Sequence, residues 1–306
     1  MSFPFKLPPR YEFNGERLEG GQGYVYICAD TFLQRKVAIK VMKLLSDGEV
    51  LKREIARLSE IRSRHVAEVY DLVMAKRSGM LGLVQQYVSG MDLTEYAKAA
   101  SADGYLHVLW QIACGLSDIH QHRKIHRDIK PANIRFDSER VIKILDFGLA
   151  ADSADAVTVH ARGTKHFLAP ELYGSPPIPL TNAIDVYAFG VVAWFLGTNG
   201  KLAAAICQIP PASSIPMPSF AATGLPLPAE VVQVLDRTLN KIPGMRPGME
   251  EVRTVLEQYL LYGRHRAYIS YGSQSRTLST PGETITLTAG ADSLTITLHT
   301  TARAFG

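Results

Sequence analysis

The stretch that decides the fold reads His126-Arg127-Asp128-Ile129-Lys130-Pro131-Ala132-Asn133, and Asp146-Phe147-Gly148 follows it after a short apolar run. Phosphoryl transfer to a hydroxyl requires a carboxylate that orients the hydroxyl, oxygen ligands for Mg²⁺ and a cation for the moving phosphate. Asp128 is the candidate base and Lys130 is the candidate cation. Asn133 and Asp146 offer the hard oxygen ligands that Mg²⁺ prefers.

A charged surface turn in an unrelated protein is the alternative interpretation of this stretch. Eight or nine specified residues in order argue against it, because each position matches by chance only about one time in twenty. The stretch resembles the catalytic loop and metal-binding turn of eukaryotic-like (Hanks-type) Ser/Thr protein kinases. The short inserts and the loop Gly20-Gly21-Gln22-Gly23 resemble bacterial members of that family.

The resemblance implies an α+β, bilobal protein kinase fold. A small β-rich N-lobe carries one regulatory helix, the larger C-lobe is mainly helical, and a C-terminal β-hairpin extension follows. The resemblance covers about residues 11 to 262. We therefore expect a leader over residues 1–10, the N-lobe over 11–87, the C-lobe over 88–262 and a β-rich extension over 263–306.

Composition is that of a soluble globular protein: 306 residues are 46% hydrophobic and 20% charged. The net charge of +4 gives no reason to expect a nucleic-acid partner or a membrane surface. Three widely spaced cysteines without a CxxC pair suggest neither disulfides nor zinc, so we expect a cytoplasmic setting. The first ten residues lack a signal-peptide core, and the longest apolar run, Val186 to Leu196, is shorter than the ~20 residues that span a bilayer.

A glycine-rich stretch near the N-terminus predicts a strand, a tight turn and a second strand. Gly20, Gly21 and Gly23 would let the backbone approach phosphates closely, although an ordinary hairpin turn is the alternative for such a cluster. The family pattern GxGxxGxV would place its first glycine at Leu18, a departure that bears on the tightness of the turn over the adenine side and not on the chemistry. Val25 matches the valine of the pattern.

The run Val37-Ala38-Ile39-Lys40 matches the third strand of the family. By resemblance Lys40 would hold the α- and β-phosphates, and Ala38 would pack on the adenine ring together with Val25. A solvated lysine at a strand end is the commoner alternative. Glu54 lies within or beside the apolar stripe of the next predicted helix and needs a partner there, which in the family is this lysine.

The segment Leu83 to Leu93 resembles the hinge between the lobes. By alignment Gln85 is the gatekeeper position, the backbones of Gln86 and Val88 would bond adenine, and Asp92 would meet the ribose. A strand that runs into a glycine turn and a helix start is an equally good interpretation of this pattern.

Lysine two residues after the aspartate, as in Asp128-Ile129-Lys130, resembles Ser/Thr kinases rather than tyrosine kinases. In family members with an arginine before the base, here Arg127, a phosphate on the activation segment usually neutralises the arginine. Thr158 occupies the usual place of that phosphate, and we expect autophosphorylation there. Thr164 would bridge the base and Lys130 beside the substrate.

Three further residues have structural roles by resemblance. Asp185 is the lone charge in the apolar segment 182–196, which predicts a helix buried on every side, and it would accept hydrogen bonds from the catalytic-loop backbone. A carboxylate that favours the helix dipole is compatible with that role. Glu171, in Ala169-Pro170-Glu171, would pair with Arg246.

Residues 105–122 predict an amphipathic helix whose His107 and His120 are structural or solvated rather than metal ligands. Near the C-terminus, two runs that alternate Thr with Ile or Leu, residues 283–288 and 293–298, predict a β-hairpin. A lone hairpin is marginal in water. It must therefore dock on the kinase, pair with another chain or begin a further module, and its hydroxyls are possible phosphorylation sites.

The expected function is ATP- and Mg²⁺-dependent phosphoryl transfer to Ser/Thr hydroxyls of protein substrates. A pseudokinase scaffold is the alternative that the glycine lost at Leu18 and the C-terminal extension suggest, although a scaffold needs none of the catalytic groups. A small-molecule kinase of the aminoglycoside or choline type ranks last, because it is not expected to carry Gly163-Thr164 followed by Ala169-Pro170-Glu171.

Overall fold

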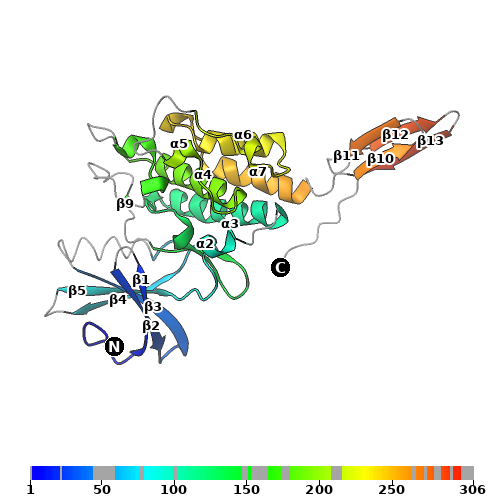
Figure 1. The fold of residues 1–306 in the computed structure, drawn as a ribbon. Coiled ribbons are helices and arrows are strands. Elements are labelled where there is room, and N and C mark those ends of the chain that lie inside the picture. The colour runs from blue at the N-terminus through cyan, green and yellow to red at the C-terminus, as the bar shows by residue number, and fades with distance from the viewer. Residues whose placement is uncertain are drawn as a thin grey trace.

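The structure, a computed structural model, describes residues 2–20, 23–43, 59–75, 79–98, 102–146, 151–152, 165–173, 180–207, 216–262, 267–271, 274–278, 284–289 and 292–297. A β-sheet lobe is followed along the chain by a helical lobe, as Figure 1 shows. The bilobal α+β fold predicted from the sequence is confirmed. The regulatory helix expected around Glu54 lies outside the described residues.

The N-lobe is a five-stranded antiparallel sheet in the order β1-β2-β3-β5-β4. Its strands are β1 (Tyr11–Gly20), β2 (Gly23–Asp30), β3 (Arg35–Lys43), β4 (Val69–Ala75) and β5 (Met80–Gln86). Successive side chains of a strand point to opposite faces. Ala38 and Lys40 therefore share the face that meets the C-lobe, and Val37 and Ile39 lie on the outer face.

A cluster of buried apolar side chains covers the outer face of the sheet. We call it the outer-face cluster, and its members are Tyr11, Tyr26, Cys28, Val37, Ile39, Val73 and Val84. The N-terminal leader, residues 2–10, packs on it. Phe3, Phe5 and Leu7 of the leader are half-buried, whereas the residues between them are exposed. The leader forms no strand among the described residues. Its apolar side chains attach it to the sheet, and at its end the carbonyl of Arg10 accepts the N–H of Thr31 at 2.9 Å.

Arg10 ties the end of the leader to β2. Its Nε and Nη2 donate to Oδ1 and Oδ2 of Asp30 at 2.9 and 2.8 Å. Asp30 also accepts the backbone N–H groups of Phe32 and Leu33. The hydrogen bonds from Arg10 lower the pKa of the Asp30 carboxyl to about 2.

This pair predicts a pH dependence for Asp30→Asn. A carboxyl with a lowered pKa contributes stability above its unfolded pKa, about 3.9, and loses it as the pH falls through the folded pKa. We expect the difference in free energy of unfolding between wild type and variant to be constant from about pH 5 to pH 8 and to shrink as the pH falls from about 4 to about 2. Urea unfolding at stepped pH measures it, and a difference that grows on acidification would contradict the prediction.

The C-lobe is built on helices. They are α2 (Leu93–Tyr96), α3 (Ala102–Gln121), α4 (Ala183–Gly197), α5 (Ala204–Cys207), α6 (Ala229–Thr238) and α7 (Met249–Tyr262). Its short strands are β6 (Lys124–Ile125), β7 (Ile134–Phe136), β8 (Ile142–Ile144) and β9 (Ala151–Asp152). Its 3₁₀ turns are η1 (Pro131–Asn133), η3 (Lys165–Phe167), η4 (Pro170–Tyr173), η5 (Phe220–Thr223) and η6 (Pro243–Met245). In the described part of the chain no helix has the length and apolarity to span a bilayer.

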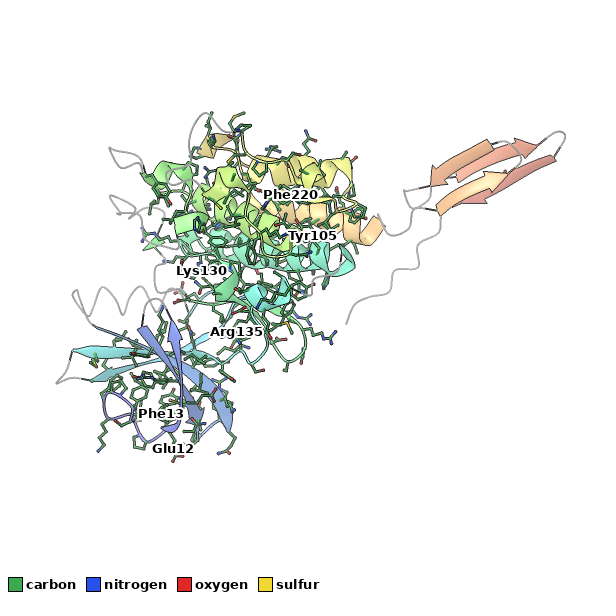
Figure 2. All side chains as sticks on the ribbon, viewed as in Figure 1. Glu12, Phe13, Tyr105, Lys130, Arg135 and Phe220 are labelled. Atoms are coloured by element: carbon green, nitrogen blue, oxygen red, sulfur yellow. The ribbon has the colours of Figure 1, made fainter. Side chains whose placement is uncertain are left out.

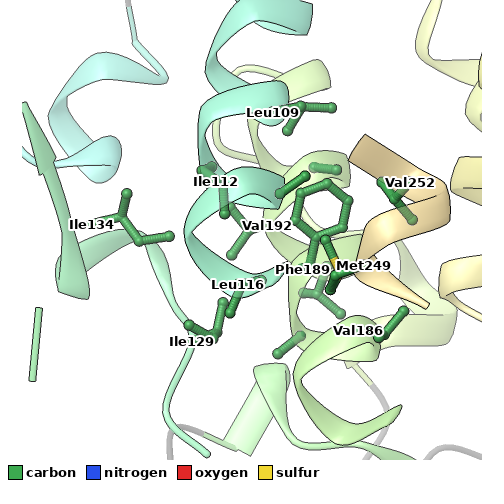
Figure 3. Close-up of a cluster of buried hydrophobic side chains, with 14 of the residues drawn as sticks. Leu109, Ile112, Leu116, Ile129, Ile134, Val186, Phe189, Val192, Met249 and Val252 are labelled. Carbon is green, nitrogen blue, oxygen red and sulfur yellow. The ribbon is translucent and has the colours of Figure 1, made fainter. Parts of the chain in front are cut away.

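Helix α4 is the centre of the C-lobe core. As its all-round apolar sequence predicts, nearly every residue of the helix is buried. Figure 3 shows Phe189 and Val192 of α4 packed between Leu109 and Leu116 of α3 and Val252 of α7. The catalytic loop is therefore built on a rigid support.

The described residues of the extension form two antiparallel hairpins. The predicted one is present, with β12 (Thr284–Ala289) paired to β13 (Asp292–Thr297). Its Thr286 and Thr295 are exposed, and their hydroxyls lie 2.9 Å apart. The other hairpin, β10 (Ala267–Tyr271) with β11 (Gln274–Leu278), was not predicted.

Candidate active site

The catalytic loop is anchored to α4 through a buried carboxylate. Asp185, only 1% exposed, accepts the backbone N–H of His126 on Oδ2 at 2.8 Å and that of Arg127 on Oδ1 at 2.9 Å. The side chain of Ile129 is buried in the C-lobe core (Figure 3). The loop is therefore fixed both by hydrogen bonds and by packing.

His120 of α3 completes this anchor, which agrees with the structural role that the sequence analysis allowed it, although no partner was named there. Its Nε2 lies 2.9 Å from Oδ2 of Asp185. Burial alone would raise the pKa of the Asp185 carboxyl, but the hydrogen bond and charge of His120, with the charge and backbone N–H of His126, outweigh it and hold that pKa below its ordinary value. The carboxylate stays charged and keeps accepting from the loop.

Asp128 lies at the centre of a short network within the loop. It is 3% exposed, and its Oδ2 accepts Nζ of Lys130 at 2.8 Å and Nδ2 of Asn133 at 2.9 Å. Nδ2 of Asn133 also donates to the backbone carbonyl of Asp128 at 2.8 Å. Figure 2 shows Lys130 on the side of the C-lobe nearest the sheet. These bonds fix the direction of the carboxylate.

Lys40 of β3 and Asp146 form an ion pair across the two lobes. Lys40 is 5% exposed, so its ammonium group needs such a partner. The backbone before Asp146 is held in turn, because the N–H of Leu145 donates to the carbonyl of Asn133 at 2.8 Å. The structure thus brings Lys40, Asp128, Lys130, Asn133 and Asp146 into one connected region.

Two site residues have a backbone conformation that is costly for a residue with a side chain. Arg127 and Asp146 each have φ of 71°. A non-glycine residue in the left-handed region costs about 1–3 kcal/mol and persists only where its surroundings impose it. Here Asp185 holds the N–H of Arg127, and the carbonyl of Asn133 holds the N–H of Leu145 just before Asp146.

Strand β8 is itself held by the segment that precedes β4. The N–H of Ala67 donates to the carbonyl of Ile144, and the N–H of Ile144 donates to the carbonyl of His65, both at 2.9 Å. The ring Nδ1 of His65 lies 3.3 Å from the carbonyl of Ile142, and burial lowers the pKa of this imidazole. A neutral ring donates there, so His65 has a structural role that the sequence analysis did not assign.

The donor set fits a magnesium nucleotide. Because Nδ2 of Asn133 donates to Asp128, its Oδ1 is the atom free to accept a metal ion. Asp146 adds a carboxylate oxygen, and hard oxygens are the ligands of Mg²⁺. Among the described residues no group of three or more His, Cys, Asp or Glu forms a site for another metal.

The glycine-rich strands pair as a tight hairpin. Leu18 lies opposite Val25, and Gly20 lies opposite Gly23, at the ends of β1 and β2. Val25 in turn lies opposite Lys40 on β3, so this hairpin borders the site. Leu18 is 45% exposed, and its side chain does not prevent the pairing.

The hinge follows β5. Gln85, Val88 and Ala38 are buried, and Ala38 lies opposite Gln85. The N–H of Gln86 already donates to the carbonyl of Glu68 at 2.8 Å, so only the carbonyl of Gln86 could bond adenine.

Asp92 caps helix α2. Its Oδ1 accepts the N–H of Glu95 at 3.0 Å, which is the helix start that the alternative interpretation of the hinge expects. The second carboxylate oxygen remains for another partner, so the cap and a ribose contact are compatible.

Gly90 is required where the hinge crosses β7. Its N–H donates to the carbonyl of Phe136 at 2.9 Å, and Nη2 of Arg135 donates to its carbonyl at 2.5 Å. A Cβ on Gly90 would lie 2.2 Å from the carbonyl oxygen of Phe136. Glycine is therefore required here because a side chain has no room, and not because the backbone has a positive φ.

Gly90→Ala is expected to lower the free energy of unfolding by about 1–3 kcal/mol, because the hinge must move away from β7. Chemical denaturation measures the loss. Gly244→Ala is the matched control, since no heavy atom lies within 4 Å of its added Cβ. Equal stability of the two variants would contradict the prediction.

The resemblance also implies a pair between Glu171 and Arg246, and the structure contains it. Nη1 and Nη2 of Arg246 donate to the two oxygens of Glu171, each at 2.7 Å. The arginine also donates from Nε to the carbonyl of Asn240 at 2.7 Å and from Nη1 to that of Ala183 at 2.8 Å. This pair joins the end of the activation segment to the helices of the C-lobe.

The remaining predicted site residues lie outside the described residues. They are Gly21, Glu54, Thr158 and Thr164, together with Phe147 and Gly148.

A hollow of about 700 Å³ lies elsewhere in the C-lobe, between the end of α3 and the starts of α4 and α7. Its lining shares no residue with the catalytic loop. Its polar side chains are largely paired, as in the bond from Ser117 to Glu250 at 2.6 Å. The groups that phosphoryl transfer requires lie around Asp128, so we assign the candidate site to that region and not to this hollow.

Comparison with known proteins agrees with this geometry. The family model described as the protein kinase domain matches residues 14–255. Serine/threonine-protein kinase PrkC of Bacillus subtilis is 33% identical over 194 residues, which cover 59% of this chain and 29% of the relative. Serine/threonine-protein kinase PknB of Mycolicibacterium smegmatis is 32% identical over 218 residues, 65% of this chain and 34% of the relative.

PknB of Mycobacterium tuberculosis is 32% identical over 210 residues, 63% of this chain and 33% of the relative. The chain thus spans about a third of the length of these curated relatives. The matched region includes the catalytic loop, the Lys40 strand and the hinge. The chain belongs to the protein kinase family, among the Hanks-type Ser/Thr kinases of bacterial type.

Proposed function

We propose that this chain is an active ATP-dependent protein Ser/Thr kinase. The observation that carries the proposal is the network around Asp128, where Lys130 and Asn133 hold the carboxylate in one direction. The Lys40–Asp146 ion pair places a second cation and a second carboxylate at the same site. A scaffold would have no need of these groups.

Each residue has a role in this proposal. Asp128 orients the substrate hydroxyl and accepts its proton, while Lys130 stabilises the charge on the moving phosphoryl group. Lys40 holds the α- and β-phosphates. Asn133 and Asp146 hold the metal, and bound Mg·ATP would supply the phosphoryl group with its charge partly neutralised.

The nucleotide lies, in the same proposal, between the glycine-rich strands and the hinge. Gly20, Gly21 and Gly23 approach the phosphates, and Val25 packs on adenine with Ala38. The carbonyl of Gln86 and the N–H of Val88 bond the base, and Asp92 meets the ribose. Glu54 orients Lys40. Thr164 contacts the protein substrate beside Asp128.

Arg127 connects the site to regulation. We propose that a phosphate on Thr158, placed by autophosphorylation, pairs with this arginine and orders the activation segment. Phosphopeptide mapping of active enzyme tests this step. An unmodified Thr158, together with full activity of Thr158→Ala, would exclude it.

Incubation of the purified chain with Mg·ATP, followed by intact mass spectrometry, tests the activity. We expect mass increments of whole phosphoryl groups in wild type, none after chelation of Mg²⁺, and none in Lys40→Met. A wild type that stays unmodified and phosphorylates no protein substrate would favour the scaffold. A nucleotide-binding measurement on the same protein then shows whether nucleotide binding is lost or only phosphoryl transfer.

A further inference from the structure

The N-terminal leader is a part of the N-lobe that the family does not account for. Residues 2–10 precede the region, 14–255, that matches the protein kinase domain. Yet Phe3, Phe5 and Leu7 pack on the outer-face cluster of the sheet. The polar and proline residues between them, such as Lys6, stay exposed.

A chain of rings connects the leader to the glycine-rich strands. The Phe3 ring lies 4.7 Å from that of Tyr26 on β2 and 6.0 Å from that of Phe13 on β1. Tyr26 lies 6.4 Å from Tyr24, and the guanidinium of Arg17 lies 4.0 Å from the Tyr24 ring centre. These separations are those of interacting aromatic pairs and of a cation–π contact.

This series of side chains ends beside the turn that borders the proposed nucleotide. Arg17 and Tyr24 are direct neighbours of Leu18 and Val25, which lie opposite each other. Leu18 precedes Gly20 on β1, and Val25 follows Gly23 on β2. Glycines supply no side chains to fix the position of the turn. The residues that flank it must do so, and β1 is an edge strand with β2 as its one neighbour in the sheet.

Phe5, in the middle of the leader, rests on β5. A Cβ on Gly82 would lie 3.4 Å from the Phe5 ring, an ordinary contact distance, so Phe5 lies against this part of β5. Phe3 and Phe5 contact each other at 4.9 Å. The leader therefore spans the outer face from β5, the strand that leads to the hinge, to β1 and β2.

We propose that the leader is a strap that positions the glycine-rich β1–β2 hairpin, with Phe3 as its principal positioning residue. The proposal rests on the proposed function, because it assigns the strap to nucleotide binding at that site. The strap acts from the face of the sheet opposite Lys40. It contacts no nucleotide and changes affinity only through the position of β1 and β2.

The first test compares Phe3→Ala with Val73→Ala in the full chain. Val73 belongs to the same outer-face cluster but lies on β4, at the far edge of the sheet. We expect Phe3→Ala to raise the Kd for Mg·ATP about fivefold, or about 1 kcal/mol at 1.4 kcal/mol per tenfold change. Val73→Ala should lower the Tm at least as much and leave Kd within about twofold.

Two further variants test whether the Phe3 ring, and not just any change in the leader, sets the affinity for Mg·ATP. Phe3→Tyr keeps the ring and should retain the wild-type Kd, and Lys6→Ala changes only an exposed leader residue and should do the same. A Kd that is unchanged in Phe3→Ala, or raised equally in Val73→Ala, would overturn the strap.

Amide hydrogen exchange of the nucleotide-free protein gives a second readout that does not depend on ATP. Phe3→Ala should speed exchange in β1 and β2 and leave β4 unchanged, whereas Val73→Ala should do the reverse. If the wild-type protein binds no nucleotide, the proposed function fails. The exchange pattern still tests whether the leader positions β1 and β2. Exchange that rises uniformly, or in neither hairpin strand, would overturn the proposed strap.

Discussion

Asp128→Asn is expected to lower kcat by about 10²–10⁴-fold, the usual contribution of a positioned general base. The amide nearly matches the carboxylate in size but cannot accept the proton of the substrate hydroxyl. Lys130 and Asn133 both donate to Oδ2, so the asparagine oxygen can take that position and accept from both of them. The bond from Lys130 is nevertheless weakened, because the amide carries no negative charge.

The KM for ATP should stay within about twofold in this variant, because the proposed nucleotide contacts lie on Lys40, the hinge and the glycine-rich strands. Initial rates with a general Ser/Thr protein substrate at several ATP concentrations separate the two constants. Asp137→Asn is the matched control. Its Oδ1 accepts the N–H groups of Glu139 and Val141 in the β7–β8 turn, which an asparagine oxygen can also do.

If Asp128→Asn kept more than a tenth of the wild-type kcat, Asp128 would not be the base. If instead KM rose while kcat held, the residue would belong to nucleotide binding. Either result would redirect the assignment to another carboxylate of the site, with Asp146 the first to examine.

The catalytic loop was predictable because phosphoryl transfer dictates which residue types must occur, and their order along the chain resembles that of the protein kinase family. The resemblance also implied that Asp185, the lone charge in an apolar helix, accepts hydrogen bonds from the catalytic-loop backbone. It did not indicate His120 as a further partner. His120 follows Leu116 by four residues on the buried side of α3, but its meeting with Asp185 depends on how α3 and α4 cross. That crossing is a long-range property of packing.

The leader and the first hairpin of the extension show two other reasons for incomplete prediction. Phe3, Phe5 and Leu7 alternate as a half-buried extended segment does, but nothing in so short a pattern tells which surface it covers. In the extension, β11 is made mostly of polar residues and lacks the alternation that marked β12 and β13. The two residues that separate β10 from β11, Gly272 and Ser273, were the available signal for a hairpin.

Arg246→Ala is expected to lower the free energy of unfolding by about 3–5 kcal/mol, the cost of leaving one member of a buried ion pair without its partner. The Arg246 side chain is fully buried, and that of Glu171 is 8% exposed. The variant would also deprive the carbonyls of Asn240 and Ala183 of their donor. In a domain of this size the loss should lower Tm by roughly 6–20 °C.

Arg237→Ala is the matched control, because it removes an arginine from an exposed pair. The side chains of Arg237 and Glu251 are 44% and 47% exposed, and such pairs contribute at most about 1 kcal/mol. Thermal unfolding followed by circular dichroism compares the two variants. Equal Tm values would mean that the Glu171 pair contributes no more than a surface contact, and the activation segment would then need another attachment to the C-lobe. A large loss confined to Arg246→Ala would establish that this buried pair, far from Asp128 in sequence, stabilises the C-lobe by much more than an exposed ion pair does.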